Sequence, residues 1–292
     1  MDQRQPLRVL IISQHNRFSQ VLATNIRYWG YEAVELPSMM AMLTNKAEEI
    51  EGDVLLYDLD EALRISPLRG DTLERSCEEL WPHVRLVIAL SSRSVSRHTL
   101  EQIGAVAVLY KPFEMGRLQR YLQVLQRLFF GDLDDRTLFD VAPRPGFVGT
   151  NARILVVDDD VDVADAVRYC LMEETAYDVA VAHDGVEALE QYLSWRPHCI
   201  VTDLIMPWMN GYQVIRCLAA ASLYMMPAFV VMSALTQFEV PWNRSYLKEN
   251  VVAYVDKPFH IDHLLTAVEQ ALHIVWEPLQ RRTLLDMICK CH

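Results

Sequence analysis

The chain has 292 residues, 51% of them hydrophobic, and carries 39 acidic against 27 basic side chains for a formal net charge of −12. This length suits two ordinary domains, and the apolar fraction suits packed cores rather than disorder. No apolar run approaches the roughly 20 residues that cross a bilayer, so we expect a soluble, cytoplasmic protein without a membrane span. The excess of acidic residues is concentrated in residues 151–292, and an acidic surface disfavours direct DNA binding.

Short apolar strands, spaced widely enough for helices between them, are predicted through the first 130 residues, at 8–12, 31–36, 54–57, 86–90 and 106–109. Residues 131–150 are rich in Asp, Pro and Gly with weak periodicity, which predicts a linker. Strands followed by amphipathic helices are predicted again at 154–157, 177–181, 199–202, 229–232 and 251–255, with helices capped at Asp184 and starting near Asn210 and Pro241. Residues 276–292 are expected to form a tail or short helix.

This alternation predicts an α/β fold with two tandem five-stranded, doubly wound parallel sheets, one in residues 1–130 and one in 151–275. The two halves repeat metrically, because Gln14 to Asp58 and Asp159 to Asp203 both span 44 positions. Lys111-Pro112-Phe113 is matched by Lys257-Pro258-Phe259 at the end of each half. We interpret the chain as two copies of one fold.

Polar residues follow the predicted strands of the second copy and are expected to meet at one edge of its sheet: Asp158, Asp159, Asp203, Ser233 and Lys257. Crowded carboxylates repel one another unless a hard cation joins them, which indicates Mg²⁺. Phosphoryl transfer to a carboxylate requires charge neutralisation and positioning, which a metal ion, an ammonium and a hydroxyl can provide. Asp203 is the predicted acceptor, with Lys257 and Ser233 in the other two roles.

Four motifs in this order resemble the signature set of response-regulator receiver domains: Val157-Asp158-Asp159, Asp203-Leu204-Ile205-Met206-Pro207-Trp208-Met209-Asn210-Gly211, Met232-Ser233-Ala234 and Lys257-Pro258-Phe259. The resemblance implies a flavodoxin-like fold and phosphorylation of Asp203 by a histidine kinase or histidine phosphotransfer protein. It also implies Mg²⁺ ligands at Asp159, Asp203 and the carbonyl of Ile205, with Asp158 acting through water. It further implies a cis peptide before Pro258 and a switch that couples Ser233 to Tyr254.

The first copy departs from this pattern, because Ser13 and Gln14 stand where the acidic pair should be. Asp58, Ser91 and Lys111 remain at the equivalent strand ends. We therefore predict a degenerate pseudo-receiver that does not hold Mg²⁺. Asp58-Leu59-Asp60 also resembles the Asp-x-Asp of haloacid-dehalogenase phosphatases, but the Gly-Thr that normally follows is missing.

The predicted function is that of a phosphorelay response regulator without an enzymatic output domain, which switches protein–protein interactions. A second copy of the chain is one candidate partner, which would form a homodimer. The partner surface is expected on the fourth helix, fifth strand and fifth helix of the second copy. Two alternatives stay open: a regulatory fragment with a catalytic output domain beyond residue 292, or a phosphate sink.

Overall fold

The computed structural model describes residues 5–13, 15–36, 51–60, 83–96, 99–100, 103–131, 152–221, 226–234 and 250–273. The chain divides into two compact units, Met1–Gly131 and Asp132–His292, which are described separately. Gln14, the helix expected near Pro241 and the tail 276–292 lie outside the described residues, as does the linker 131–150 apart from Gly131. The predicted domain boundaries stay predictions.

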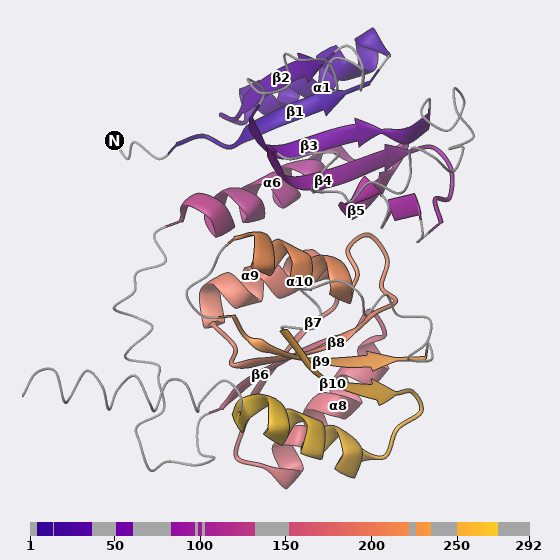
Figure 1. Ribbon diagram of the computed structural model, residues 1–292. Helices are drawn as coiled ribbons and strands as arrows, with labels where there is room; N and C mark the ends of the chain where they lie inside the picture. The colour runs from indigo at the N-terminus through magenta and orange to yellow at the C-terminus, as the bar shows by residue number, and fades with distance from the viewer. Residues whose placement is uncertain are drawn as a thin grey trace, which may run out of the picture. The chain divides into compact units, whose positions relative to one another are not determined.

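The first unit is built around a five-stranded parallel sheet in the order β2-β1-β3-β4-β5. Its elements are β1 (Arg8–Ile12), α1 (Asn16–Tyr28), β2 (Glu32–Leu36), β3 (Gly52–Asp58), β4 (Val84–Ser91), β5 (Ala105–Tyr110) and α6 (Met115–Phe130) (Figure 1).

The second unit repeats this topology, with its sheet in the order β7-β6-β8-β9-β10 and all strands parallel. Its elements are β6 (Arg153–Val157), α8 (Val161–Glu174), β7 (Asp178–Ala182), α9 (Gly185–Trp195), β8 (Cys199–Asp203), α10 (Gly211–Ala220), β9 (Ala228–Ser233), β10 (Val251–Asp256) and a last helix over residues 261–273. Figure 1 shows α9 and α10 on one face of this sheet, and α8 with the last helix on the other. The predicted α/β, doubly wound, flavodoxin-like fold class is confirmed.

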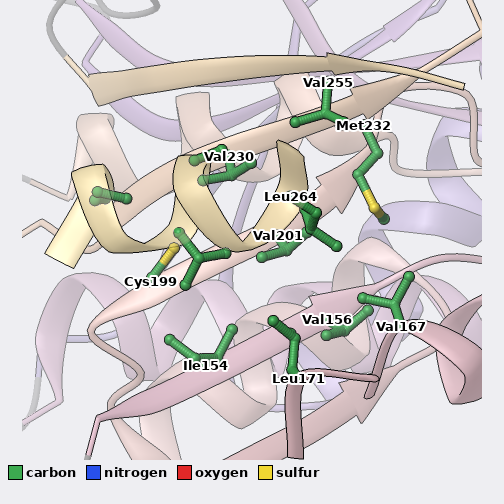
Figure 2. Packing of buried hydrophobic residues seen from close by; sticks show 14 of the residues in the cluster. Ile154, Val156, Val167, Leu171, Cys199, Val201, Val230, Met232, Val255 and Leu264 are labelled. Carbon is green, nitrogen blue, oxygen red and sulfur yellow. The ribbon is translucent and has the colours of Figure 1, made fainter. Parts of the chain in front are cut away.

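The central strands of the second unit are apolar on both faces because helices cover both. All four residues of Ile154–Val157 are fully buried. Alternate residues of β6, β8 and β9 point toward α8 and the last helix, where they form one core cluster (Figure 2): Ile154, Val156, Cys199, Val201, Val230 and Met232, packed with Val167, Leu171 and Leu264. Such packing holds the carboxyl ends of these strands in a fixed register.

The strand order changes direction at β6, since the chain passes from β6 to β7 on one side and then to β8 on the other. In open parallel sheets the crevice at this switch point is where ligands bind. The residues that end β6 and β8 therefore line the place where a functional site is expected.

Candidate functional site

The carboxyl edge of the second unit's sheet brings together the polar residues singled out in the sequence. Asp203 and Ser233 are the last residues of β8 and β9, and Asp158 and Lys257 directly follow β6 and β10. Asp158, Asp203 and Ser233 are buried, whereas Asp159 is exposed. Four separate strands thus supply one compact polar cluster.

Lys257 joins the two buried carboxylates. Its Nζ lies 2.6 Å from Oδ2 of Asp158 and 2.5 Å from Oδ2 of Asp203. Burial alone would lower the pKa of Lys257, but its hydrogen bonds to Asp158 and Asp203 outweigh burial and raise it. The ammonium is therefore charged at neutral pH and neutralises part of the acidic cluster.

Asp158, Asp159 and Asp203 form a group that fits a hard divalent cation. Each offers a carboxylate oxygen, and these oxygens all lie within 4.8 Å of one another. Burial raises the pKa of Asp158, opposed by the hydrogen bond from Lys257. Three carboxylates whose oxygens lie this close together offer the hard oxygen ligands that Mg²⁺ prefers. These residues therefore fit the ion that the receiver resemblance implies.

The loop after Asp203 is shaped by close packing against the start of α10. The backbone N–H of Ile205 donates to Oδ1 of Asp203 over 2.9 Å. At Gly211 a Cβ atom would lie 2.4 Å from the carbonyl oxygen of Asp203, so there is no room for a side chain. Asn210 caps α10 through a capping box with Gln213. Trp208 has φ of 73°, which is uncommon for a bulky residue.

The proposed switch residues lie on neighbouring strands. Ser233 is fully buried at the end of β9. Tyr254 of β10 pairs in register with Val231, which lies two residues before Ser233 on β9. Tyr254 lines a groove of about 480 Å³ that also involves Phe259 and His263. The peptide bond between Lys257 and Pro258 is cis, as is the equivalent bond before Pro112.

The first unit places Asp58, Ser91 and Lys111 at the matching positions of its own sheet. Lys111 Nζ lies 2.6 Å from Oδ1 of Asp58, and the hydroxyl of Ser13 donates to Oδ2 of Asp58 over 2.8 Å. Lys111 also contacts Oδ2 of Asp60 at 3.0 Å. The sequence analysis did not predict that Asp60 would pair with Lys111. The available signal was an acidic residue two positions after Asp58, where the second unit has Ile205.

Within the residues that the structure describes, no helix is both long and apolar enough to cross a membrane.

Comparison with known proteins identifies the family of the second unit. Residues 154–269 match the family model of the response regulator receiver domain. This part of the chain is therefore one receiver domain. The model's match does not extend to the first unit, whose likeness to the second rests on strand order and on the matching strand-end residues.

The curated relatives include Response regulator MprA of Mycobacterium ulcerans, 36% identical over 122 residues, which are 42% of this chain and 50% of that protein. The same regulator of Mycobacterium bovis is 35% identical over 122 residues, covering 42% of this chain and 51% of the relative. The chain thus spans about half the length of the curated relatives it matches. Among solved structures, Vibrio cholerae chemotaxis protein CheY4 is 27% identical with a TM-score of 0.38, covering 42% of this chain and all of that one.

Proposed function

We propose that the chain is a phosphorelay response regulator that accepts a phosphoryl group on Asp203 of its second unit. The observation that carries this proposal is the ammonium of Lys257 held between Asp158 and Asp203, inside a carboxylate cluster of a receiver domain. The similarity to curated response regulators supports a histidine kinase or histidine phosphotransfer protein as the donor.

In this mechanism an oxygen of Asp203 attacks the phosphorus of the donor, and the bond from phosphorus to the donor's nitrogen breaks as the acyl phosphate forms. Lys257 is already charged and in contact with Asp203, so it can neutralise an oxygen of the transferred group without moving far. Ser233 ends the adjacent strand and can donate its hydroxyl proton to another such oxygen. No proton has to leave Asp203, since the carboxylate is the nucleophile.

Asp158, Asp159 and Asp203 would hold Mg²⁺, with the carbonyl of Ile205 as a further oxygen donor. When bound there, the ion would neutralise negative charge that develops on the oxygens of the transferred group. The residues of the chain fix where it lies: buried Asp158 and Asp203 face Lys257, and exposed Asp159 offers the approach from solvent.

The test is labelling of the full chain with a small phosphodonor such as acetyl phosphate in the presence of Mg²⁺. We expect one label per chain, lost in Asp203→Asn and retained in Asp58→Asn. The two variants are matched, because each replaces the last residue of the third strand in its own sheet. Label that survives in Asp203→Asn, or disappears only in Asp58→Asn, would contradict the assignment.

The output of this regulator is a change in protein–protein association rather than catalysis. Phosphorylation draws Ser233 toward Asp203, and Tyr254 on the neighbouring strand follows into the vacated space. Because Tyr254 lines the groove beside the last helix, its movement changes the surface that a partner or a second copy would contact. Light scattering with and without the phosphoryl mimic beryllofluoride, in wild type and Tyr254→Ala, tests this: identical association in all states would contradict it.

The first unit, in this proposal, is a degenerate receiver that contributes contacts rather than phosphorylation. Asp58 keeps its place at the strand end, but Ser13 replaces the buried carboxylate that Asp158 supplies in the second unit. The expected absence of direct DNA binding stays a prediction, and a catalytic output domain or a role as a phosphate sink stay the alternatives to this proposal.

A further inference from the structure

The carboxylate of Asp60 in the first unit is surrounded by donors. Its Oδ1 accepts the backbone N–H of Ser92 over 2.6 Å and lies 3.3 Å from the hydroxyl of Ser91. Its Oδ2 contacts the ammonium of Lys111 at 3.0 Å. The Ser91 hydroxyl also lies 2.9 Å from the carbonyl of Arg93, so its single proton is shared between two acceptors. An ammonium, a backbone amide and a hydroxyl therefore converge on one anionic group.

These donors occupy the positions of the phosphoryl-binding groups in the second unit. Ser91 ends β4 as Ser233 ends β9, and Lys111 follows β5 as Lys257 follows β10. The backbone N–H of Lys111 donates to the carbonyl of Ser91 over 2.7 Å, and the backbone N–H of Lys257 donates to the carbonyl of Ser233 over the same distance. The two pairs of strand ends therefore have the same local backbone geometry. In the proposed function this lysine and this serine hold the oxygens of the phosphoryl group on the neighbouring aspartate.

We propose that Asp60 is a built-in phosphoryl mimic, which keeps the first unit permanently in the form that a receiver takes when phosphorylated. The inference rests on the proposed roles of Lys257 and Ser233. Asp60 stands two residues after Asp58, the equivalent of Asp203, and its carboxylate accepts hydrogen bonds from Lys111, Ser91 and Ser92.

Charge supports this assignment. Asp58 and Asp60 together carry two negative charges, about the charge of a phosphoryl group on an otherwise neutral aspartyl ester. Burial alone would raise the pKa of Asp60, but hydrogen bonds from Ser92 and Lys111 outweigh it and lower the pKa. The aromatic ring of Phe18 lies 4.5 Å from Lys111 Nζ and helps to hold the ammonium in place.

The oxygens of Asp58 and Asp60 are already occupied by hydrogen bonds within the first unit. Every oxygen of the two carboxylates accepts a hydrogen bond from the chain: Asp58 from Ser13, Lys111 and the N–H of Asp60, and Asp60 from Ser91, Ser92 and Lys111. A phosphoryl group or a metal ion would have to displace these bonds. The first unit accordingly needs neither for its anionic group to be held.

The experiment removes the mimic and offers the anion it replaces. In Asp58→Asn/Asp60→Ala the amide at position 58 stands for the neutral acyl group of an aspartyl phosphate, and the donors at Lys111, Ser91 and Ser92 have lost the Asp60 carboxylate. ¹⁵N-labelled full-length chain in EDTA is titrated with inorganic phosphate, against chloride at equal ionic strength, and the backbone amide of Ser92 is followed by NMR. We expect a saturable phosphate-specific shift in this variant and none in wild type.

Glu32→Gln is the matched control, since it removes a carboxylate of the same unit from an exposed pair with Arg8, and it should behave as wild type. A double variant that responds to phosphate no more than to chloride would overturn the proposal, as would a phosphate response of wild-type Ser92. Should the double variant not fold, Asp60→Asn decides: the Ser92 amide proton must move upfield as its acceptor loses charge, and an unchanged resonance overturns the assignment. Labelling of Asp203 in the same preparations tests the proposed function separately.

Discussion

Lys257 carries the electrostatics of the second unit's site at the scale of single residues. Its ammonium contacts two carboxylates whose side chains are 1% and 12% exposed, so water screens the cluster weakly. Two such carboxylates without a shared cation would repel each other and lose their hydrogen-bond donor. The lysine thus stabilises the site through the two carboxylates that it joins.

Lys257→Met should lower the free energy of unfolding of the second unit by about 1–3 kcal/mol in EDTA, because Asp158 and Asp203 lose their common donor. Mg²⁺ should then stabilise the variant more than it stabilises wild type. Calorimetric unfolding with and without Mg²⁺ measures both effects. Arg168→Met, which breaks an exposed pair with Asp165, is the control and should cost at most about 0.5 kcal/mol. An unchanged stability of Lys257→Met in EDTA would refute this account.

The free energy of unfolding of the first unit should depend on pH through the carboxylate of Asp60. Its pKa is lowered below the ordinary value of 3.8, so the folded state binds a proton less readily than the unfolded chain. Its contribution to stability is therefore complete above pH 3.8 and is lost as the pH falls through the folded pKa. Asp60→Asn should be less stable than wild type at neutral pH, and the difference should shrink in acid. Urea unfolding at a series of pH values checks this, and a gap that does not narrow would speak against it.

At the scale of elements, the start of α10 decides where Asp203 lies. Gly211 is the first residue of this helix, and a Cβ atom there would lie 2.4 Å from the carbonyl oxygen of Asp203, the last residue of β8. The glycine is needed for a close approach between helix and strand rather than for a special dihedral angle. The Asn210 capping box fixes the same helix end from the other side.

Gly211→Ala should destabilise the second unit by about 1–3 kcal/mol and weaken phosphorylation, because its Cβ forces the helix away from Asp203. Gly116→Ala is a matched control near the start of α6, where a Cβ would meet nothing within 4 Å. That variant should be neutral or up to about 1 kcal/mol more stable, since alanine favours helix. Thermal unfolding and the rate of Asp203 labelling report the two effects, and equal behaviour of the two variants would disprove the packing argument.

At the scale of the whole molecule, one topology carries two different sites. The cluster of Asp158, Asp159, Asp203 and Lys257 has a net charge of −2, which a divalent cation can neutralise. The cluster of Asp58, Asp60 and Lys111 has a net charge of −1, and chain donors already occupy its oxygens. The two units therefore differ in their need for an external ion.

The full chain should bind one Mg²⁺ ion rather than two. Isothermal titration calorimetry measures this stoichiometry, and Asp159→Asn should weaken binding because it removes a hard oxygen ligand and a full charge. Asp58→Asn is the control in the first unit and should leave the affinity unchanged. A second ion per chain, or an Mg²⁺ affinity that depends on Asp58, would contradict the distinction between the units.

Much of this architecture could be predicted from the chain of letters. Runs such as Ile154–Val157 are apolar throughout because both faces of a parallel strand are covered. Asp184 and Asn210 cap the helices that follow them. Strands alternating with helices permit few topologies, so the carboxyl edge that collects Asp158, Asp203, Ser233 and Lys257 follows from their positions after strands.

The sequence by itself thus determined the fold class of both units and which residues of the second end at one edge of the sheet, because these depend on periodicity and position along the chain. Only the tertiary structure decided which charged groups form ion pairs. Lys257 pairs with Asp158 and Asp203, whereas Lys111 pairs with Asp58 and Asp60. Each lysine directly follows the fifth strand of its own unit and precedes a proline, so the residues next to the lysines do not distinguish them. Their partners are set by short distances between side chains 51 to 99 residues apart, which depend on packing rather than on any local pattern.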